Sequence, residues 1–114
     1  MDIRDIILAA NDLPREPVRV PEWDTTVAVR TLTGAERDQW ERETWEDKQG
    51  DRLRNVRARL VAWCVCDEAG GRVFQDADVP ALSGKSGRAL DRVYAVAARL
   101  NGITKEEEAE LVKN

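Results

Sequence analysis

Few residues in this chain could carry out chemistry, and histidine is absent. The chain therefore lacks the usual proton shuttle at neutral pH and the commonest metal ligand. Cys64 and Cys66 are its two cysteines, and on a helix two side chains at this spacing diverge by roughly 200°, which places them poorly for pairing. A zinc site would need two further ligands. We expect buried structural thiols and no metal or cofactor.

A second motif, Ser83-Gly84-Lys85-Ser86, has the Gly-Lys-Ser ending of a phosphate-binding loop. The full loop needs an earlier glycine, where the backbone approaches the phosphates, and Val79 occupies that position. Asp24, Asp67 and Glu68 have no placed base or nucleophile beside them, so carboxylate catalysis lacks its partners. We interpret the motif as a loop that ends in a helix cap and predict that the protein is not an enzyme.

The segment that must organise the fold is residues 55–70, the longest apolar stretch, which we expect to be a central helix. Between Leu60 and Cys66 it carries no charge. A helix that is apolar on nearly every side needs neighbours on at least two sides. Gly70 and Gly71 are expected to end it, because glycine adopts the left-handed conformation that closes helices. The apolar positions recur at helical spacing: Leu53, Val56, Leu60, Trp63 and Cys64.

Around this helix the sequence predicts a β-hairpin and further helices. Prolines exclude helix from residues 14–21, and valines alternate on both sides of residues 21–26, which indicates a hairpin whose first strand lies at an edge. The fold class is therefore α+β, with an N-terminal β-hairpin or small antiparallel sheet packed on a bundle of about four helices, in a single domain over residues 1–114. Helix caps and apolar spacing predict these other elements: helices at 3–10, 34–47, 86–100 and from 104 onward, a brief helix at 76–82 and a short strand at 72–74 that joins the sheet.

The charge of the chain argues against nucleic acid as a partner, because the formal net charge is −4 and phosphate contacts need a basic excess. No segment nears the roughly 20 apolar residues of a membrane span. We therefore expect a soluble, cytoplasmic protein with no membrane partner and with weak, reversible self-association, since the surface is heavily charged. The arginines of residues 52–59 follow an acidic helix. We interpret the arginines and these acids as intramolecular charge pairs, with binding of an acidic partner or nucleic acid as the alternative.

The order of segments also resembles the tail assembly chaperones of long-tailed (siphovirus-type) bacteriophages and prophages. The resemblance implies a non-enzymatic protein that binds and solubilises the long tape measure protein and helps to recruit tail tube subunits. It implies a place in the host cytoplasm and absence from the mature virion. The alternative is a small structural virion component, such as a head–tail connector or tail-completion protein. The matching stretches span most of the chain: residues 7–14, 29–38, 57–63, 71–74, 90–94 and 100–104, with an acidic helix up to Asn114.

A chaperone for long amphipathic helices needs an apolar or aromatic strip flanked by charge. Two stretches offer one: the helix at 34–47, with two tryptophans among acids, and the last helix, with an apolar end beside glutamates. The arginines after residue 50 would form a basic rim. The alternatives are that Trp40 belongs to the core, that Trp45 covers the central helix and that the last helix docks on its own domain. The candidate partner-binding residues are Trp40, Trp45, Arg52, Arg57, Arg59, Leu111 and Val112.

The thiol interpretation gives a first prediction. Replacing both Cys64 and Cys66 with Ala should leave the fold intact and lower the free energy of unfolding by ~1–3 kcal/mol, the cost of small cavities. Chemical denaturation of the double variant measures this loss. Zinc in the purified protein, or unfolding by a chelator, would contradict the prediction.

Overall fold

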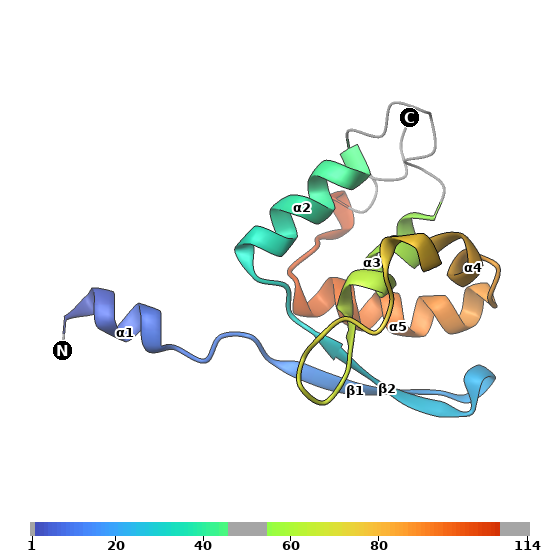
Figure 1. Cartoon of the computed structure of the whole chain (residues 1–114), viewed down its shortest axis with the longest axis horizontal. Coiled ribbons are helices and arrows are strands. Elements are labelled where there is room, and N and C mark those ends of the chain that lie inside the picture. The colour runs from blue at the N-terminus through green and yellow to red at the C-terminus, as the bar shows by residue number, and fades with distance from the viewer. Residues whose placement is uncertain (1, 46–54, 108–114) are drawn as a thin grey trace.

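The computed structural model describes residues 2–45 and 55–107. Figure 1 shows helices gathered on one side of a small sheet, with the first helix standing apart. This is the α+β architecture that the sequence predicts. The elements, in chain order, are α1 (Ile3–Ala9), β1 (Arg15–Val20), the 3-10 turn η1 (Pro21–Trp23), β2 (Thr25–Arg30), α2 (Gly34–Trp45), α3 (Val56–Cys64), β3 (Val65–Cys66), the 3-10 turn η2 (Asp76–Asp78), α4 (Val79–Ser83) and α5 (Gly87–Leu100).

The sheet is antiparallel, with the strand order β1-β2-β3. Strands β1 and β2 form the predicted hairpin, in which Val18 lies opposite Val27. Val18, Val20 and Val29 are buried in the core that the sheet shares with the helices, whereas Pro17 on the outer strand is exposed. Along β1, one face of the sheet is thus packed and the other is open, as is common for antiparallel sheets. The strand order also confirms that β1 lies at the edge of the sheet. Proline is tolerated there because it has no N–H to donate to a further strand.

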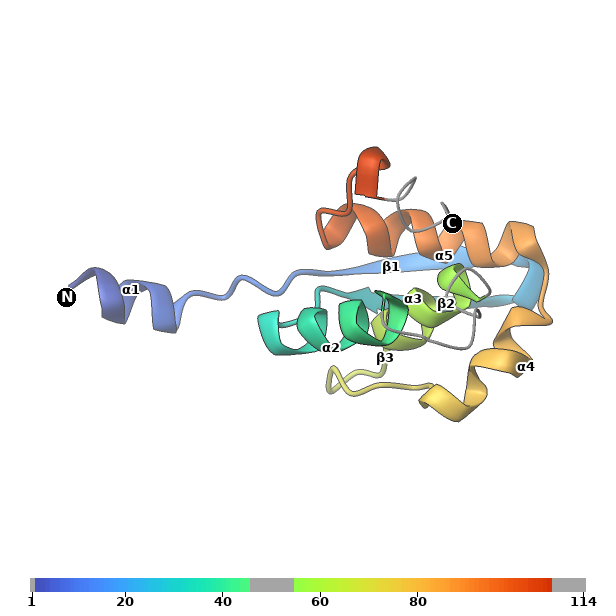
Figure 2. The same ribbon diagram turned by 90° about the horizontal axis from the view of Figure 1, so that it is seen from above.

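Helix α3 is the predicted central helix. All of its residues except Arg57 and Arg59 are buried, and it packs against α2, α4 and α5. Figure 2 shows it lying between α2 and α5. Its apolar character on nearly every side is explained by these neighbours, because each one covers a different part of the helix surface.

The predicted extension of this helix to Gly70 is wrong. The helix ends at Cys64, and Val65 is extended, with φ −69° and ψ 124°. Val65 and Cys66 form β3, in which Val65 pairs with Val29 of β2. A β-branched valine favours the extended backbone, and the pairing satisfies its peptide groups against the hairpin. Contacts with the sheet therefore override the helical pattern that continues in the sequence.

The third strand also differs from the prediction. We expected residues 72–74 to join the sheet, but only Arg72 forms a bridge, with Cys66, and the strand is 65–66 instead. Gly70 adopts the left-handed conformation expected of it, with φ 89°. It does so in the turn that brings the chain back towards β3, in which the Gly70 N–H donates to the Asp67 carbonyl at 2.9 Å, and not at the end of a helix.

The starts of the helices predicted at 34–47, 86–100 and from 104 are confirmed by the caps at Thr33, Ser86 and Thr104, which immediately precede the first helical residues. The N–H of Glu36 donates to Thr33 Oγ1 at 3.2 Å, and the N–H of Thr33 donates to Glu36 Oε1 at 2.9 Å, which is the reciprocal box expected before α2. The hydroxyl of Ser86 accepts a backbone N–H of the first turn of α5 at 3.2 Å. Thr104 Oγ1 accepts the N–H of Glu107 at 3.0 Å, at the start of a helical turn whose continuation lies outside the described residues.

The brief helix predicted around Asp76 is present as η2 and α4. Its cap is Gln75, which pairs reciprocally with Asp78, so Asp76 is not the cap. Pro80 lies in the first turn of α4, where its missing N–H breaks no helical bond. The Gly-Lys-Ser motif connects α4 to the cap of α5, as the plainer interpretation of that motif required.

The first helix leaves the body of the protein. Asp2 caps it by accepting the N–H of Asp5 at 2.9 Å, so the predicted two-turn helix is present. Its apolar stripe is not packed, however, because every residue from Asp2 to Pro14 is exposed. Figures 1 and 2 both show α1 pointing away from the other elements. We call residues 2–13 the arm. Its root is held by Pro14, whose carbonyl accepts the N–H of Thr31 at 3.2 Å and the hydroxyl of Thr31 at 2.8 Å.

One arginine joins the sheet to two helices. The side chain of Arg30, at the end of β2, is 11% exposed. Its Nε and Nη2 donate to the carbonyl of Trp63 at 3.0 and 2.8 Å, which satisfies an acceptor at the end of α3. Its Nη1 donates to Glu36 Oε2 at 2.8 Å, in the capping box of α2. The positive charge also lies at the C-terminal end of α3, where it is favourable for the helix dipole.

We predict that Arg30→Met lowers the free energy of unfolding by about 2–3 kcal/mol, because it leaves a part-buried carbonyl and a part-buried carboxylate without their donor. Arg19→Met is the matched control, since Arg19 pairs with Asp24 at 2.7 Å where both side chains are more than half exposed. This control should lose less than about 0.5 kcal/mol. Equal losses in urea unfolding of the two variants would contradict the role of Arg30.

A further prediction concerns acid. Partial burial opposes ionisation of Glu36, but hydrogen bonds from Thr33 and from the Arg30 guanidinium prevail and hold the pKa of Glu36 below its ordinary 4.5. A depressed pKa in the folded state stabilises the fold above pH 4.5 and loses that effect as the pH falls through the folded pKa. Glu36→Gln should therefore melt at a lower temperature than the parent at pH 7, and the difference should shrink below pH 4.5. A difference in melting temperature between the two proteins that stays constant down to pH 3 would contradict the stabilising role of the Glu36 carboxylate.

Candidate protein-binding surface

The structure describes three of the seven candidate partner-binding residues completely. Trp40 lies in α2, and Arg57 and Arg59 lie in the first turns of α3. The described part of the predicted strip is thus the middle of α2 and the beginning of the central helix. The other candidates lie outside the described residues: Arg52, Leu111, Val112 and the side chain of Trp45.

Trp40 does not belong to a surface, which corrects its place among the candidates. Its side chain is 2% exposed, and that of Thr44, one turn later, is 1% exposed. Both face the core because they share one side of α2, which packs on α3. Neither the indole N–H of Trp40 nor the hydroxyl of Thr44 has a hydrogen-bond partner in the described part of the chain.

Trp63 is in the core, as its spacing predicts, with 8% of it exposed. Its indole N–H donates to Glu43 Oε2 at 3.0 Å, which links α3 to α2. The guanidinium of Arg72 lies 4.0 Å from the centre of its ring, a cation–π contact. Trp63 is therefore a core residue whose indole N–H is fixed by Glu43 and whose ring is covered on one face by Arg72.

The two described arginines of the predicted rim differ. Arg57 is exposed and pairs with Asp91 of α5 at 2.7 Å, so its partner is not the acidic helix that we expected. Arg59 does reach that helix, where it donates to the backbone carbonyl of Glu43 at 3.3 Å. Of the acids in α2, Glu36 and Glu41 pair with Arg30 and Arg37. The predicted pairing with the acids of α2 is thus wrong for Arg57, and Glu36 and Glu41 are paired by arginines from outside the 52–59 cluster.

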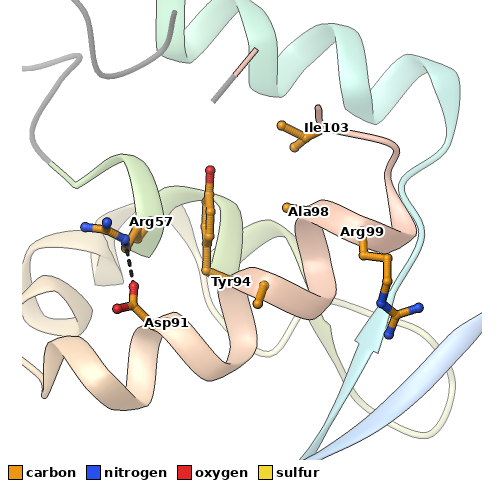
Figure 3. A pocket seen from close by; sticks show the side chains of 7 residues that line it. Arg57, Asp91, Tyr94, Ala98, Arg99 and Ile103 are labelled. Carbon is orange, nitrogen blue, oxygen red and sulfur yellow. Dashed lines mark ion pairs between the residues drawn. The ribbon is translucent and has the colours of Figure 1, made fainter. Parts of the chain in front are cut away.

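A depression of about 540 Å³ lies beside Arg57. Figure 3 shows the Arg57–Asp91 pair at one end, Arg99 at the other, and Tyr94 and Ile103 between them. Tyr94 is 5% exposed, so the floor is closed. An apolar floor with charged ends is the chemistry of a protein contact rather than of a catalytic centre, because no nucleophile and base meet there.

The thiols are buried, as predicted, and both are unpaired. Burial raises the pKa of Cys64 to about 12, so the reactive thiolate is strongly disfavoured. Within residues 2–45 and 55–107, no three or more acidic, cysteine or histidine side chains are grouped to hold a metal ion. No helix in those ranges is long and apolar enough to cross a bilayer.

The largest apolar surface is one that our sequence argument missed. Ile3, Ile6, Ile7 and Leu8 of α1 are 51–69% exposed, and Leu13 is 43% exposed. The spacing of the isoleucines predicts the helix at 3–10, but that prediction did not include exposure of its apolar side. The available signal was the run of three consecutive aliphatic residues in a very short helix, because such a run cannot all face one core, followed by prolines that lead the chain away.

Together, these features define a small α+β protein whose surface is suited to contacts with other proteins. The sequence profile of the phage tail assembly chaperones matches residues 2–111, and the chain therefore belongs to this family. This is a family of chaperones, and the protein is not an enzyme. The fold is similar to the solved structure of the bacteriophage HK97 tail assembly chaperone, with a TM-score of 0.62 and 20% sequence identity over 90% of this chain and 96% of that one. No curated protein matches the chain.

Proposed function

We propose that this chaperone binds the tape measure protein, keeps it soluble and helps to recruit tail tube subunits to it during tail assembly. The observation that carries the proposal is the family match over residues 2–111. It acts in the host cytoplasm and leaves before the virion is complete.

The described surface supports this proposal through its chemistry. A tape measure protein must span the tail, so it offers long helices whose apolar stripes aggregate when uncovered. A chaperone must cover such stripes without holding them permanently, which favours small apolar areas edged by charge. The depression beside Arg57 has this composition, with Asp91 and Arg99 around Tyr94 and Ile103. Of the predicted strip we retain Trp45, Arg52, Arg57, Arg59, Leu111 and Val112 as the binding surface, without Trp40.

Co-expression with the tape measure protein of the same genome tests the proposal. The full chain should raise the soluble fraction of the tape measure protein several-fold. Trp45→Ala and Leu111→Ala should each remove most of that gain while the melting temperature stays unchanged. Val73→Ala is the matched control, since Val73 is a body residue with 50% of its surface exposed, and it should rescue the client fully.

Two results would overturn the proposal or its site. If the full chain leaves the tape measure protein insoluble, the proposed function is wrong. If both variants rescue the client fully, or if they unfold at lower temperature, the strip is not the binding surface. Mass spectrometry of purified particles separates the chaperone from a structural virion component, because a chaperone should be absent from the finished particle and a connector or completion protein present.

A further inference from the structure

The apolar surface of the described chain is concentrated in the arm. Five of the six large hydrophobic residues that are exposed lie in residues 2–13, and the sixth, Val73, is alone on the body. Ile3, Ile6 and Ile7 follow the spacing of one helix face. No residue of α1 is buried, so these isoleucines do not contribute to the core. A soluble fold rarely displays a stripe of this kind unless another molecule covers it.

The size of the arm limits what it can hold. Seven residues make a helix of roughly 10 Å in length and about 10 Å in diameter, so one face offers only a few hundred Å². A stable pair of proteins buries about 800 Å² on each partner. One arm is therefore too small to hold a partner by itself. It suits a partner on which the same apolar stripe recurs, so that several arms, or an arm and the body, engage together.

The charge of the arm favours one kind of partner. The arm carries three carboxylates, on Asp2, Asp5 and Asp12, and one guanidinium, on Arg4, which already pairs with Asp5 at 3.4 Å. The whole chain is also negative, with a net charge of −4. Two copies of the chain therefore repel one another, whereas a helix with lysine or arginine beside its apolar stripe is attracted.

The anchor of the arm keeps it available. Pro14 is fixed by two hydrogen bonds from Thr31, and residues 10–14 belong to no helix or strand. Five extended residues span at most ~17 Å. Helix α1 is thus displayed beyond the N-terminal end of β1 (Figure 2).

We propose that the arm is a client-contact element, which packs Ile3, Ile6 and Ile7 against the apolar stripe of a long amphipathic helix with basic flanks. The inference rests on the proposed function and adds to it a second contact site, distinct from the α2 and α3 strip, and the charge of the helix that this site accepts. The contact is weak for one arm and becomes strong where stripes repeat along one client.

Binding of labelled peptides to the full chain tests this directly. One peptide is a long amphipathic helix whose leucine stripe, flanked by lysines, repeats far enough to engage several arms, and its matched peptide carries glutamates in place of the lysines. The arm variant is Ile3→Ala with Ile7→Ala, because alanine keeps the helix while removing the stripe. Val73→Ala is the control, with a similar exposed fraction on the body.

The lysine peptide should bind the parent chain, and the arm variant should weaken that binding about tenfold with an unchanged melting temperature. The control should bind like the parent, and the glutamate peptide should bind several-fold more weakly. Failure of the parent to bind the lysine peptide, or equal binding by the arm variant, overturns the inference. So does sedimentation in which the parent forms assemblies that the arm variant loses, since the arm would then contact a second copy.

Co-expression separates this inference from the proposed function. If the parent chain and the arm variant rescue the tape measure protein equally well, the function stands and the role of the arm is wrong. If neither rescues it, the function itself fails. A rescue by the parent that drops with the arm variant, but not with Val73→Ala, supports both.

Discussion

The fold depends on the guanidinium of Arg30, where three otherwise separate elements meet. It lies at the end of β2, closes the C-terminal end of α3 at the Trp63 carbonyl and holds Glu36 in the cap of α2. Each contact is a charge-assisted hydrogen bond in a part-buried place, where such bonds are stronger than at the surface. Because the same residue serves the sheet and both helices, the hairpin and the helical layer cannot shift independently.

Much of this arrangement could be predicted from local sequence. The caps at Thr33, Ser86 and Thr104 and the alternation of the hairpin depend on neighbouring residues, so they can be inferred without tertiary information. The short strand β3 could not, because residues 65–66 continue a helical pattern and become a strand only through pairing with β2. The error at 72–74 has the same cause, because residues 65–66 occupy the free edge of β2.

The candidate site was harder to predict than the fold. The spacing of Trp40 fits either a core or a strip, and burial at 2% is decided by where α2 lies on α3. The isoleucines of the arm show the opposite case, because an apolar stripe normally indicates packing, and the path of the described chain leaves this stripe uncovered. The partner of a charged side chain also depends on the tertiary fold. Arg57 was expected to pair with the helix before it, but it pairs with Asp91, which lies far along the sequence.

The outer strand of the sheet, β1, has a consequence for aggregation. An unpaired strand edge is a template on which another backbone can continue the sheet, and such growth leads towards fibrils. In β1, Pro17 has no N–H to offer an incoming strand, and exposed Arg15 and Arg19 flank it on either side. Lateral sheet extension is thereby blocked at the middle of the edge. An incoming strand would therefore meet a missing donor and two like charges on β1, both of which disfavour growth of a cross-β aggregate from this edge.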